Sequence, residues 1–260
     1  MLMENRLLGI LNKELKFSFN TEIFEEAVST NDYCKNLAKS SKDDALIIAL
    51  SQTGGKGRLG RSFFSPKESG IYLSFLLHPN LNADQCAKIT TAAAVAAAQA
   101  IDFVSGKKSY IKWVNDIYLD GKKVAGILTE AGFSGNNAKV QYAVMGIGVN
   151  LFDPKGGFPD DIKDKAGSVF GKLLPNAELT VKFIKEFVKY FLDIYAILPD
   201  TLYMENYKSR SMLIGKKVYF IKNGEKHSGL VLGIDNDARL LLSTDNGSMT
   251  LNAGEVSINM

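Results

Sequence analysis

The sequence has few residues of the kinds that build metal clusters, disulfides and histidine-dependent active sites. It contains two cysteines and two histidines in 260 residues. Cys34 and Cys86 stand far apart without metal-ligand spacing, so we expect each to be a small apolar side chain rather than a ligand or half of a disulfide. The two histidines match no motif. The sequence therefore offers neither a metal site nor a Ser-His-Asp triad.

Long apolar runs and a strong charge bias are also missing. No run reaches the roughly 18 apolar residues of a membrane span, and residues 1–19 lack the apolar core of a signal peptide. We therefore expect a cytoplasmic protein that does not enter a membrane. The net charge is only +3, so the composition does not call for a nucleic-acid partner. The hydrophobic share of 46% is enough for a globular core.

The sequence does contain one short segment rich in glycine and positive charge, residues 54–61. Four glycines and three cations fall within these eight residues. Glycine lets the backbone approach a phosphate closely, and lysine and arginine carry charge that a hydrophobic core does not accept unpaired. The segment is typical of a loop that encloses an anion. A solvated basic turn is the simpler alternative.

Three known glycine-rich motifs are excluded by the sequence around the loop or by the absence of their companion motifs. The loop fits the G-x-G-x-x-G fingerprint, but a dinucleotide site needs a helix directly after it. Residues 62–70 contain proline and glycine, which oppose a helix, and a strand-like run follows at 71–77. A P-loop needs the same helix, and a protein kinase needs His-Arg-Asp and Asp-Phe-Gly triplets that this sequence does not contain. A basic glycine loop between two strands remains.

The hydrophobic pattern around this loop predicts a mixture of strands and helices. Asp120-Gly121 predicts a hairpin, because both residues tolerate positive φ. Thr30 or Asn31 is expected to cap an early helix, and Thr180 to cap a late one. The expected strands are 22–28, 45–50, 71–77, 110–119, 122–131 and 141–151, with a long alanine-rich helix at 83–104.

The late helix and the C-terminal segment have distinct patterns. The helix after Thr180 carries an apolar stripe at helical spacing, which we expect to enter the core. The stripe consists of Phe183, Ile184, Phe187, Val188, Phe191 and Tyr195. From residue 213 the pattern changes to short strands separated by turn signals such as Asn246-Gly247, which predicts a small β-barrel after the main domain.

A second group of unusual residues is Lys112–Asp116, which the pattern places inside a strand. Alternate side chains of a strand face opposite ways, so Lys112, Val114 and Asp116 would share one face. A lone strand lysine is ordinarily a solvated edge residue, and that interpretation stays open. Gly126 and the glycines of 146–150 also fall inside expected strands, where glycine weakens a sheet unless a ligand lies against its backbone. Three strands thus look adapted to one shared pocket.

Taken in order, these segments resemble the biotin-protein ligases, the biotin-[acetyl-CoA-carboxylase] ligase family. The segments that carry the resemblance are Ser29–Asn31, Gln52–Thr53, Gly55–Arg61, Lys112–Asp116, Val124–Leu128 and Gly146–Asn150. The resemblance extends over nearly the whole chain and implies an α+β fold. Residues 1–212 would form a catalytic domain, a mixed β-sheet with helices on one side, and residues 213–260 a small SH3-like β-barrel. Fewer than 30 residues precede Ser29, so we expect a monofunctional form without a DNA-binding domain.

The resemblance also implies a reaction. Biotin and ATP would form biotinyl-5′-AMP and pyrophosphate, and a lysine of a biotin carboxyl carrier protein would then accept the biotin. Lys112 would bridge the biotin carboxylate and the α-phosphate, while Arg58 and Arg61 would neutralise the phosphates together with Mg²⁺. We expect residues 54–65 to be mobile without ligand and to close over biotin, which would exclude water.

The residues implied for the two substrates overlap at the basic loop and at Lys112. Those implied for biotin are Ser29, Thr30, Asn31, Gln52, Gly55, Lys56, Gly57, Arg58, Lys112, Gly126, Gly146 and Gly148. Those implied for the nucleotide are Arg58, Arg61, Phe63, Lys112, Asn115 and Asn150. No protein-held metal ion is implied beyond the Mg²⁺ that accompanies ATP.

The sequence departs from the family pattern at three positions, and other functions stay open. Lys56 stands where Arg is frequent, Phe63 where Trp is frequent and Val114 where Pro is common; the first keeps its charge but loses bidentate geometry. A lipoate-protein ligase would share the fold but carries a different glycine-arginine motif. A biotin sensor without turnover would not need Lys112, Arg58 and Arg61 together. The resemblance implies no nucleic-acid or membrane partner and allows a homodimer.

Overall fold

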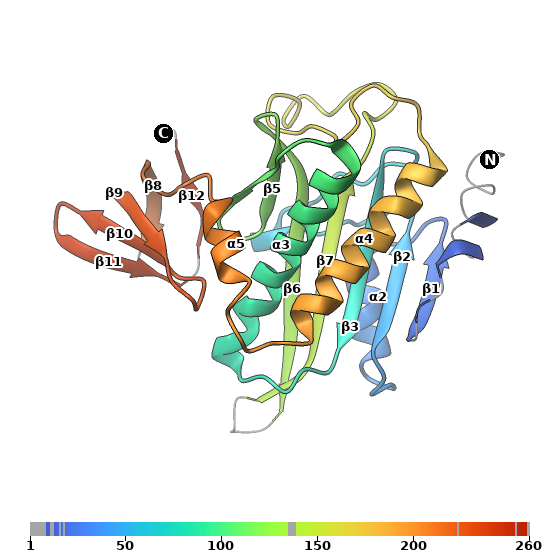
Figure 1. Ribbon diagram of the computed structural model, residues 1–260, viewed down its shortest axis with the longest axis horizontal. Coiled ribbons are helices and arrows are strands. Elements are labelled where there is room, and N and C mark those ends of the chain that lie inside the picture. Colours follow the sequence, from blue (N-terminus) through green and yellow to red (C-terminus); the bar gives the residue numbers. More distant parts are fainter. Residues whose placement is uncertain are drawn as a thin grey trace.

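The computed structural model describes residues 9–10, 13–15, 17, 19–134, 139–222, 224–252 and 254–258 (Figure 1). They form a large β-sheet with helices packed on it and a smaller second sheet at one end, which confirms the expected α+β class. The helices are α2 Thr30–Leu37, α3 Cys86–Ser105, α4 Ala177–Tyr195 and α5 Met204–Ser209, with 3-10 turns η1 Arg58–Gly60 and η2 Ala83–Gln85.

Seven strands form the large sheet in the order β1-β2-β3-β7-β6-β5-β4. The β1–β2 pair is parallel and the other neighbours are antiparallel, so the sheet is mixed as expected. The predicted Asp120-Gly121 hairpin joins β5 to β6, with both turn residues at positive φ. The strands are β1 Asn20–Phe24, β2 Ala45–Ala49, β3 Gly70–Leu77, β4 Tyr110–Lys112, β5 Asp116–Leu119, β6 Lys122–Ser134 and β7 Lys139–Asn150.

Helices cover both faces of this sheet, so the expectation of helices on one side is wrong. In Figure 1, α3 and α4 lie together in front of the sheet and α2 lies behind it. Side-chain alternation in β2 separates two cores. Leu46 and Ile48 belong to the large cluster that includes α3 and α4, whereas Ala45 and Ile47 pack with Cys34 of α2. A short helix can cover the second face because the buried patch there is small.

The two long helices supply most of the core on the front face. The predicted α4 stripe is confirmed, since Phe183, Phe187 and Phe191 are fully buried and stack along the helix. The stretch 83–105 is long and apolar enough to cross a membrane, with a mean hydropathy of 1.2. However, 67% of its most apolar window is buried inside the protein. This stretch therefore has the character of a core helix.

Two helix caps differ from the prediction. Ser29, rather than Thr30 or Asn31, caps α2, where its hydroxyl accepts the N–H of residue 32 at 3.3 Å. Asn176, rather than Thr180, caps α4 by accepting the N–H groups of residues 178 and 179 at 2.9 and 3.1 Å. Because Ser29 takes the capping role, the side chains of Thr30 and Asn31 are free to face the sheet.

The segment Lys112–Asp116 is not a continuous strand, contrary to the prediction. β4 ends at Lys112, β5 begins at Asp116, and the three residues between them form a tight turn whose Trp113–Val114 peptide bond is cis. Lys112 pairs with Asp116 across the turn, so these two still share a face. Residues 113–115 follow no strand alternation, because each is held by a different part of the protein.

Tertiary contacts hold this turn in place. Trp113 Nε1 donates to the carbonyl of Ala238 at 2.7 Å, and the hydroxyl of Tyr207 in α5 donates to the carbonyl of Val114 at 2.9 Å. Tyr207 and Ala238 each lie more than ninety residues after the turn residue that they contact. Local sequence patterns therefore carry no sign of the turn.

The C-terminal segment folds into a five-stranded antiparallel sheet with an SH3-like arrangement, in the order β11-β10-β9-β8-β12. It lies beyond α5 at one end of the large sheet (Figure 1). This agrees with the predicted small β-barrel. The strands are β8 Lys217–Lys222, β9 Glu225–Ile234, β10 Leu240–Thr244, β11 Gly247–Leu251 and β12 Val256–Ser257.

Candidate functional site

A pocket opens on the α2 face of the large sheet, over β6 and β7. The empty space measures about 300 Å³, including the part open to solvent. The side chains come from α2, the basic loop and the sheet. The pocket is lined by Ser29, Thr30, Asn31, Gln52, Lys56, Phe63, Gly126, Leu128, Gly146, Ile147 and Gly148.

The strand glycines allow other side chains to lie directly against the sheet. A Cβ on Gly146 would stand 1.8 Å from Asn31 Oδ1, and one on Gly148 would stand 2.6 Å from the ring of Phe63. A Cβ on Gly126 would meet the same ring at 3.2 Å. The close approach of α2 and the basic loop thus requires glycine at positions 146 and 148 and leaves little room at 126, which explains these glycines inside strands.

Polar side chains form one wall of the pocket. Gln52 Oε1 accepts the backbone N–H of Thr30 at 2.8 Å and the Thr30 hydroxyl at 3.2 Å. Ser74 Oγ, on β3, lies 2.7 Å from both Thr30 Oγ1 and Asn31 Oδ1. Thr30, Asn31 and Ser74 are all buried. Buried polar groups are costly unless they are hydrogen-bonded, so this wall is held in a fixed geometry.

The basic loop folds back over the pocket as a small hairpin. Gly57 N donates to the carbonyl of Arg61 at 2.7 Å, and Phe63 N donates to the carbonyl of Gly55 at 2.9 Å. At the tip, Leu59 and Gly60 adopt φ of 54° and 74°. The fold of the loop places Phe63 against the sheet and Lys56 at the pocket rim.

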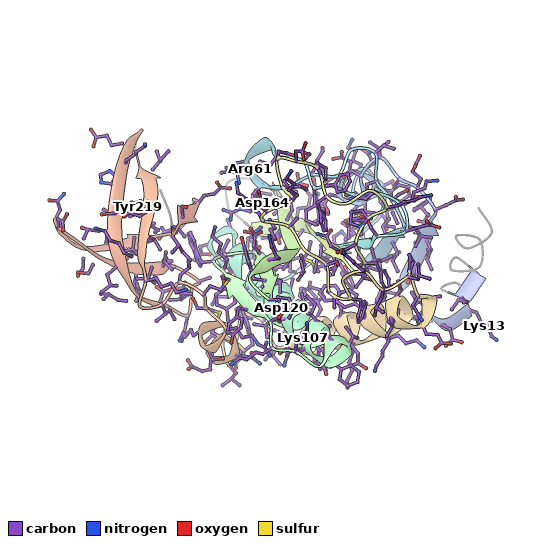
Figure 2. All side chains as sticks on the ribbon, turned by 90° about the horizontal axis from the view of Figure 1, so that it is seen from above. Lys13, Arg61, Lys107, Asp120, Asp164 and Tyr219 are labelled. Atoms are coloured by element: carbon purple, nitrogen blue, oxygen red, sulfur yellow. The ribbon has the colours of Figure 1, made fainter. Side chains whose placement is uncertain are left out.

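The two arginines of the loop turn away from the pocket toward the small barrel. Arg58 Nη1 donates to Asn115 Oδ1 at 2.9 Å and its Nη2 donates to the carbonyl of Gly254 at 3.1 Å. Arg61 Nη2 donates to Glu255 Oε2 at 2.6 Å, on the side of the large sheet nearest the barrel (Figure 2). Neither arginine lines the pocket. Both would have to exchange these partners to meet a phosphate.

Lys112 lies on the same face as the pocket but two strands away from it. The register runs from Lys112 to Asp116 to Gly126. Neighbouring strands are about 4.8 Å apart, so the Cα atoms of Lys112 and Gly126 are separated by about 10 Å. Within the part of the chain that the structure describes, the Lys112 ammonium has no ion-pair or hydrogen-bond partner. A long side chain at this distance could reach a ligand that extends beyond the pocket.

Lys123 is a cation next to the pocket that sequence reasoning missed. Its Nζ lies 3.4 Å from the position of a Cβ on Gly126 and 2.7 Å from Asp116 Oδ1. The side chain is about one-third exposed, at 33%. The position of Lys123 directly before Val124–Leu128, one of the segments that carry the family resemblance, could have indicated its role. Leu128 and Ile147, which also line the pocket, lie within the segments that carry the resemblance but were not singled out, because they read as ordinary strand residues.

Asn115 and Asn150, predicted for the nucleotide, are buried beside the pocket rather than in it. Asn115 Nδ2 donates to the carbonyl of Ile127 at 2.8 Å, in addition to the contact with Arg58. Asn150 Nδ2 donates to the carbonyl of Gly167 at 3.0 Å. These amides fix the ends of β5 and β7, where the chain leaves the sheet.

The predicted biotin residues and the pocket overlap to a large extent. The pocket contains Ser29, Thr30, Asn31, Gln52, Lys56, Gly126, Gly146 and Gly148 from that set, and Phe63 from the nucleotide set. Outside it are Gly55, Gly57, Arg58, Arg61, Lys112, Asn115 and Asn150. The structure thus gathers the residues predicted for one small ligand and leaves most of the predicted phosphate contacts on its rim or beyond.

The sequence is similar to known proteins over almost its full length. The pattern of the biotin/lipoate A/B protein ligase family matches residues 24–150, and that of the biotin protein ligase C-terminal domain matches residues 213–258. The chain is 30% identical to the bifunctional ligase/repressor BirA of Bacillus spizizenii, over 94% of this chain and 78% of that protein. It is also 30% identical to the biotin–[acetyl-CoA-carboxylase] ligase of Paracoccus denitrificans, over 88% of this chain and 96% of that protein.

Solved structures are similar as well. The biotin protein ligase of Aquifex aeolicus in complex with biotin and ATP matches with a TM-score of 0.72 at 26% identity, over 93% of this chain and 98% of that one. The biotin protein ligase of Leishmania major in complex with biotinyl-5-AMP matches with a TM-score of 0.59 at 20% identity, a likeness of fold.

Proposed function

The chain belongs to the biotin protein ligase family, and we propose that it is an ATP-dependent ligase that attaches biotin to a lysine of a biotin carboxyl carrier protein. In the first step a biotin carboxylate oxygen attacks the α-phosphorus of ATP, and the bond to the β-phosphate breaks to release pyrophosphate. In the second step the carrier lysine amine attacks the acyl carbon of biotinyl-5′-AMP. AMP leaves, the amine loses its proton, and an amide is formed.

The observation that carries this proposal is the pocket itself. Three strand glycines, a buried hydrogen-bonding wall and a basic glycine loop meet around one small pocket on the sheet. Thr30 and Gln52 supply donors and acceptors on the wall, where they can meet the ureido ring of biotin. The strand glycines leave the sheet backbone open to the rest of the ligand.

The chemical obstacle to the first step is repulsion between a carboxylate and a phosphate. Cations fixed where the charge develops lower this barrier. Lys123 is best placed for that role, because its ammonium lies beside Gly126 and is oriented by Asp116. Lys112 shares the face and has no partner among the described residues, so it remains the predicted bridge to the α-phosphate. Asp116 pairs with the Lys123 ammonium and stands opposite Lys112 in the strand register.

The nucleotide is proposed to lie between the pocket and the small barrel. Phe63 offers a ring face beside the pocket, and Arg58 and Arg61 lie on the loop above it. Mg²⁺ would arrive bound to the ATP phosphates as part of the substrate. Arg58 and Arg61 would exchange Asn115, Gly254 and Glu255 for phosphate oxygens, and the loop would thereby tighten over the ligand.

The proposal also covers the domain division, the location and the assembly. We place a catalytic domain at residues 1–212 and the SH3-like domain at 213–260, which is supported by the start of β8 at Lys217 and the family match at 213–258. We place the protein in the cytoplasm, and a homodimer stays a prediction. No nucleic-acid or membrane partner is proposed.

The test is pyrophosphate release from MgATP in the presence of biotin, lipoate or neither, followed by mass spectrometry of an added biotin carboxyl carrier domain. We expect release that depends on biotin and a carrier mass gain of a single biotin. Release with lipoate alone would reassign the chain to the lipoate ligases. Biotin binding without pyrophosphate release would indicate a sensor that does not turn over.

A further inference from the structure

The basic loop is tied to helix α2 by an ion pair at the pocket rim. Lys56 Nζ lies 2.7 Å from Asp32 Oδ2 and 2.8 Å from Asp32 Oδ1, so the ammonium bridges both carboxylate oxygens. Asp32 does not line the pocket, whereas Lys56 does. The charge of Lys56 is therefore directed at α2 rather than at the interior of the pocket.

Asp32 belongs to a network that continues along the pocket wall. Lys35 Nζ lies 2.9 Å from Asp32 Oδ1 and 2.9 Å from Glu130 Oε1 of β6. Glu130 Oε2 in turn accepts the side-chain N–H of Asn31 at 2.9 Å. Since Asn31 lies over Gly146 in the pocket, the network connects the rim of the loop with the floor of the pocket.

The two roots of the loop are held by neutral hydrogen bonds. Gln52 N donates to the carbonyl of Ser65 at 3.0 Å, and Gln52 Nε2 donates to Ser65 Oγ at 3.3 Å. Between these roots, Lys56 is the loop residue whose ammonium reaches α2. The loop is thus anchored at its roots, at the barrel through Arg58 and Arg61, and at α2 through Lys56.

Electrostatics favour the charged form of the Lys56–Asp32 ion pair, here called the clasp, at neutral pH. Burial by itself would raise the pKa of Asp32, but hydrogen bonds from Lys56 and Lys35 outweigh it and hold that pKa below its ordinary value. The Lys56 and Asp32 side chains are 45% and 34% exposed, so salt will screen the pair. The ion pair is therefore weak enough to break when the loop opens, and it still favours the closed loop.

We propose that Asp32 is a positioning residue that holds the basic loop closed over the pocket through Lys56, and that it thereby slows the escape of the acyl-adenylate. The inference rests on the proposed ligase function. Its chemistry requires such a device, because the mixed anhydride must be kept from water until a carrier lysine arrives. Lys56 stands where the family often has Arg, and here its ammonium fits between the two oxygens of one carboxylate.

The experiment compares Asp32→Asn, Lys56→Met and the charge-reversed double variant Asp32→Lys with Lys56→Asp. The matched control is Asp160→Asn, which removes an exposed carboxylate that pairs with Lys163 at 2.7 Å and does not line the pocket. Biotinyl-5′-AMP is formed on the enzyme, and its release rate, the rate of pyrophosphate release and the melting temperature are measured. These readouts separate loop closure from the chemical step and from overall stability.

We expect Asp32→Asn to release the adenylate about two- to fivefold faster, a change typical of one partly exposed ion pair. Adenylation at saturating substrate should stay within about twofold, and 1 M NaCl should speed release in the wild type but not in Asp32→Asn. The double variant should recover part of the slow release, limited by repulsion between the new lysine at position 32 and Lys35, and Asp160→Asn should match the wild type. Unchanged release in Asp32→Asn would overturn the proposal.

The experiment distinguishes a failure of the Asp32 proposal from a failure of the proposed ligase function. If the wild type shows no biotin-dependent pyrophosphate release, the proposed function fails. Trypsin cleavage after Arg58 and Arg61 then measures loop closure directly, since a closed loop is a poor protease substrate. Faster cleavage in Asp32→Asn than in Asp160→Asn supports the clasp, and equal cleavage overturns it.

Discussion

At the scale of single residues, the pocket depends on absent side chains as much as on present ones. Gly146 and Gly148 let Asn31 and Phe63 lie on the sheet, and any Cβ there would overlap them. A strand glycine is normally a weakness, because it loses more conformational freedom on folding and offers no side chain to pack. In this protein that weakness is offset by the contacts that the missing side chains permit.

The roles of the two lysines on the pocket face give a direct prediction. We expect Lys123→Ala to lower biotin-dependent pyrophosphate release by about 10²- to 10³-fold, the size of losing one fixed charge contact in the transition state. Lys112→Ala should have an effect of that size only if Lys112 bridges the carboxylate and the α-phosphate, as the sequence predicted. The measurement is single-turnover pyrophosphate release with saturating biotin and MgATP.

Lys122→Ala is the matched control for this comparison. Its ammonium contacts the carbonyl of Asp164 on the connecting segment after β7, and the residue does not line the pocket. We expect it to retain near-normal release, with a melting temperature similar to the other variants. Near-normal release in Lys123→Ala combined with a large loss in Lys112→Ala would show that Lys112 alone carries the charge contact.

Residue types with unusual chemistry were predictable, and ordinary ones were not. Lys112, Arg58 and the strand glycines stand out because charge and glycine are costly in a sheet, so the sequence marked them without any structure. Leu128 and Ile147 line the same pocket but look like any core residue. Lys123 was missed because a lysine next to a hairpin turn is usually solvated.

At the scale of elements, the basic loop combines flexibility with several weak anchors. Its backbone closes on itself through Gly57 with Arg61 and through Gly55 with Phe63. Its side chains reach α2 through Lys56 and the small barrel through Arg58 and Arg61. The glycines make the closed state entropically costly, so these anchors are needed to offset that cost.

We predict that backbone amides of residues 57–63 exchange rapidly without ligand and slow by at least about tenfold when biotin and MgATP are bound. The reason is that substrate phosphates would add charged contacts to a loop held by partly exposed pairs. Hydrogen-exchange mass spectrometry of the free and bound protein measures this. Amides of the β10–β11 hairpin provide an internal control that should not change. Equal protection of the loop in both states would contradict the proposed closure.

Other elements show which local signals were sufficient. The long α3 and the stripe of α4 were predicted because their patterns are strong over many residues. The caps were assigned wrongly because Thr180 and Asn176 are both competent capping residues four positions apart, and only the backbone geometry selects Asn176. The Lys112–Asp116 turn was missed because its partners, Tyr207 and Ala238, lie far away in sequence.

At the scale of the whole molecule, the small barrel and the large sheet share the region around the pocket. Trp113 binds the barrel at Ala238, while the loop arginines reach the segment 254–255 that leads into β12. Lys88 on α3 and Asp237 on the barrel lie 3.5 Å apart across the same boundary. Contacts with the barrel therefore help to fix the conformations of both the 113–115 turn and the basic loop.

The boundary between α3 and α5 gives a prediction of pH dependence. The hydroxyl of Tyr203 is buried between Thr91 Oγ1 at 2.9 Å and the carbonyl of Lys88 at 3.1 Å. Burial raises the pKa of Tyr203 from 10.0 to about 12, a shift that the hydrogen bond with Thr91 only partly counteracts. Because the folded pKa is raised, the stabilisation is fully present below pH 10 and is lost as the pH rises from about 10 through about 12.

We expect the free energy of unfolding to fall by up to about 2–3 kcal/mol across this interval on account of Tyr203. Urea unfolding at pH 8, 10 and 12, followed by the fluorescence of the single tryptophan, measures it. In Tyr203→Phe this part of the alkaline loss should disappear, because phenylalanine has no proton to release. An identical pH dependence in the variant and the wild type would show that Tyr203 is not responsible.

The sequence by itself determined the chemistry of this protein and most of its elements. Glycine and charge at positions where a core would reject them, placed in a fixed order along the chain, identified the family, the α+β fold and most of the pocket residues. These signals are local, since they depend on the cost of a residue type within its own strand or loop.

Only the tertiary structure decided how those residues face one another. It placed Lys123 rather than Lys112 beside Gly126, turned Arg58 and Arg61 toward the barrel, and joined Lys56 to Asp32. Such contacts depend on sheet register and on partners tens to hundreds of residues away, and side-chain periodicity carries no information about either. The sequence thus specified which groups are available, and the packing of sheet, helices and barrel specified which of them meet.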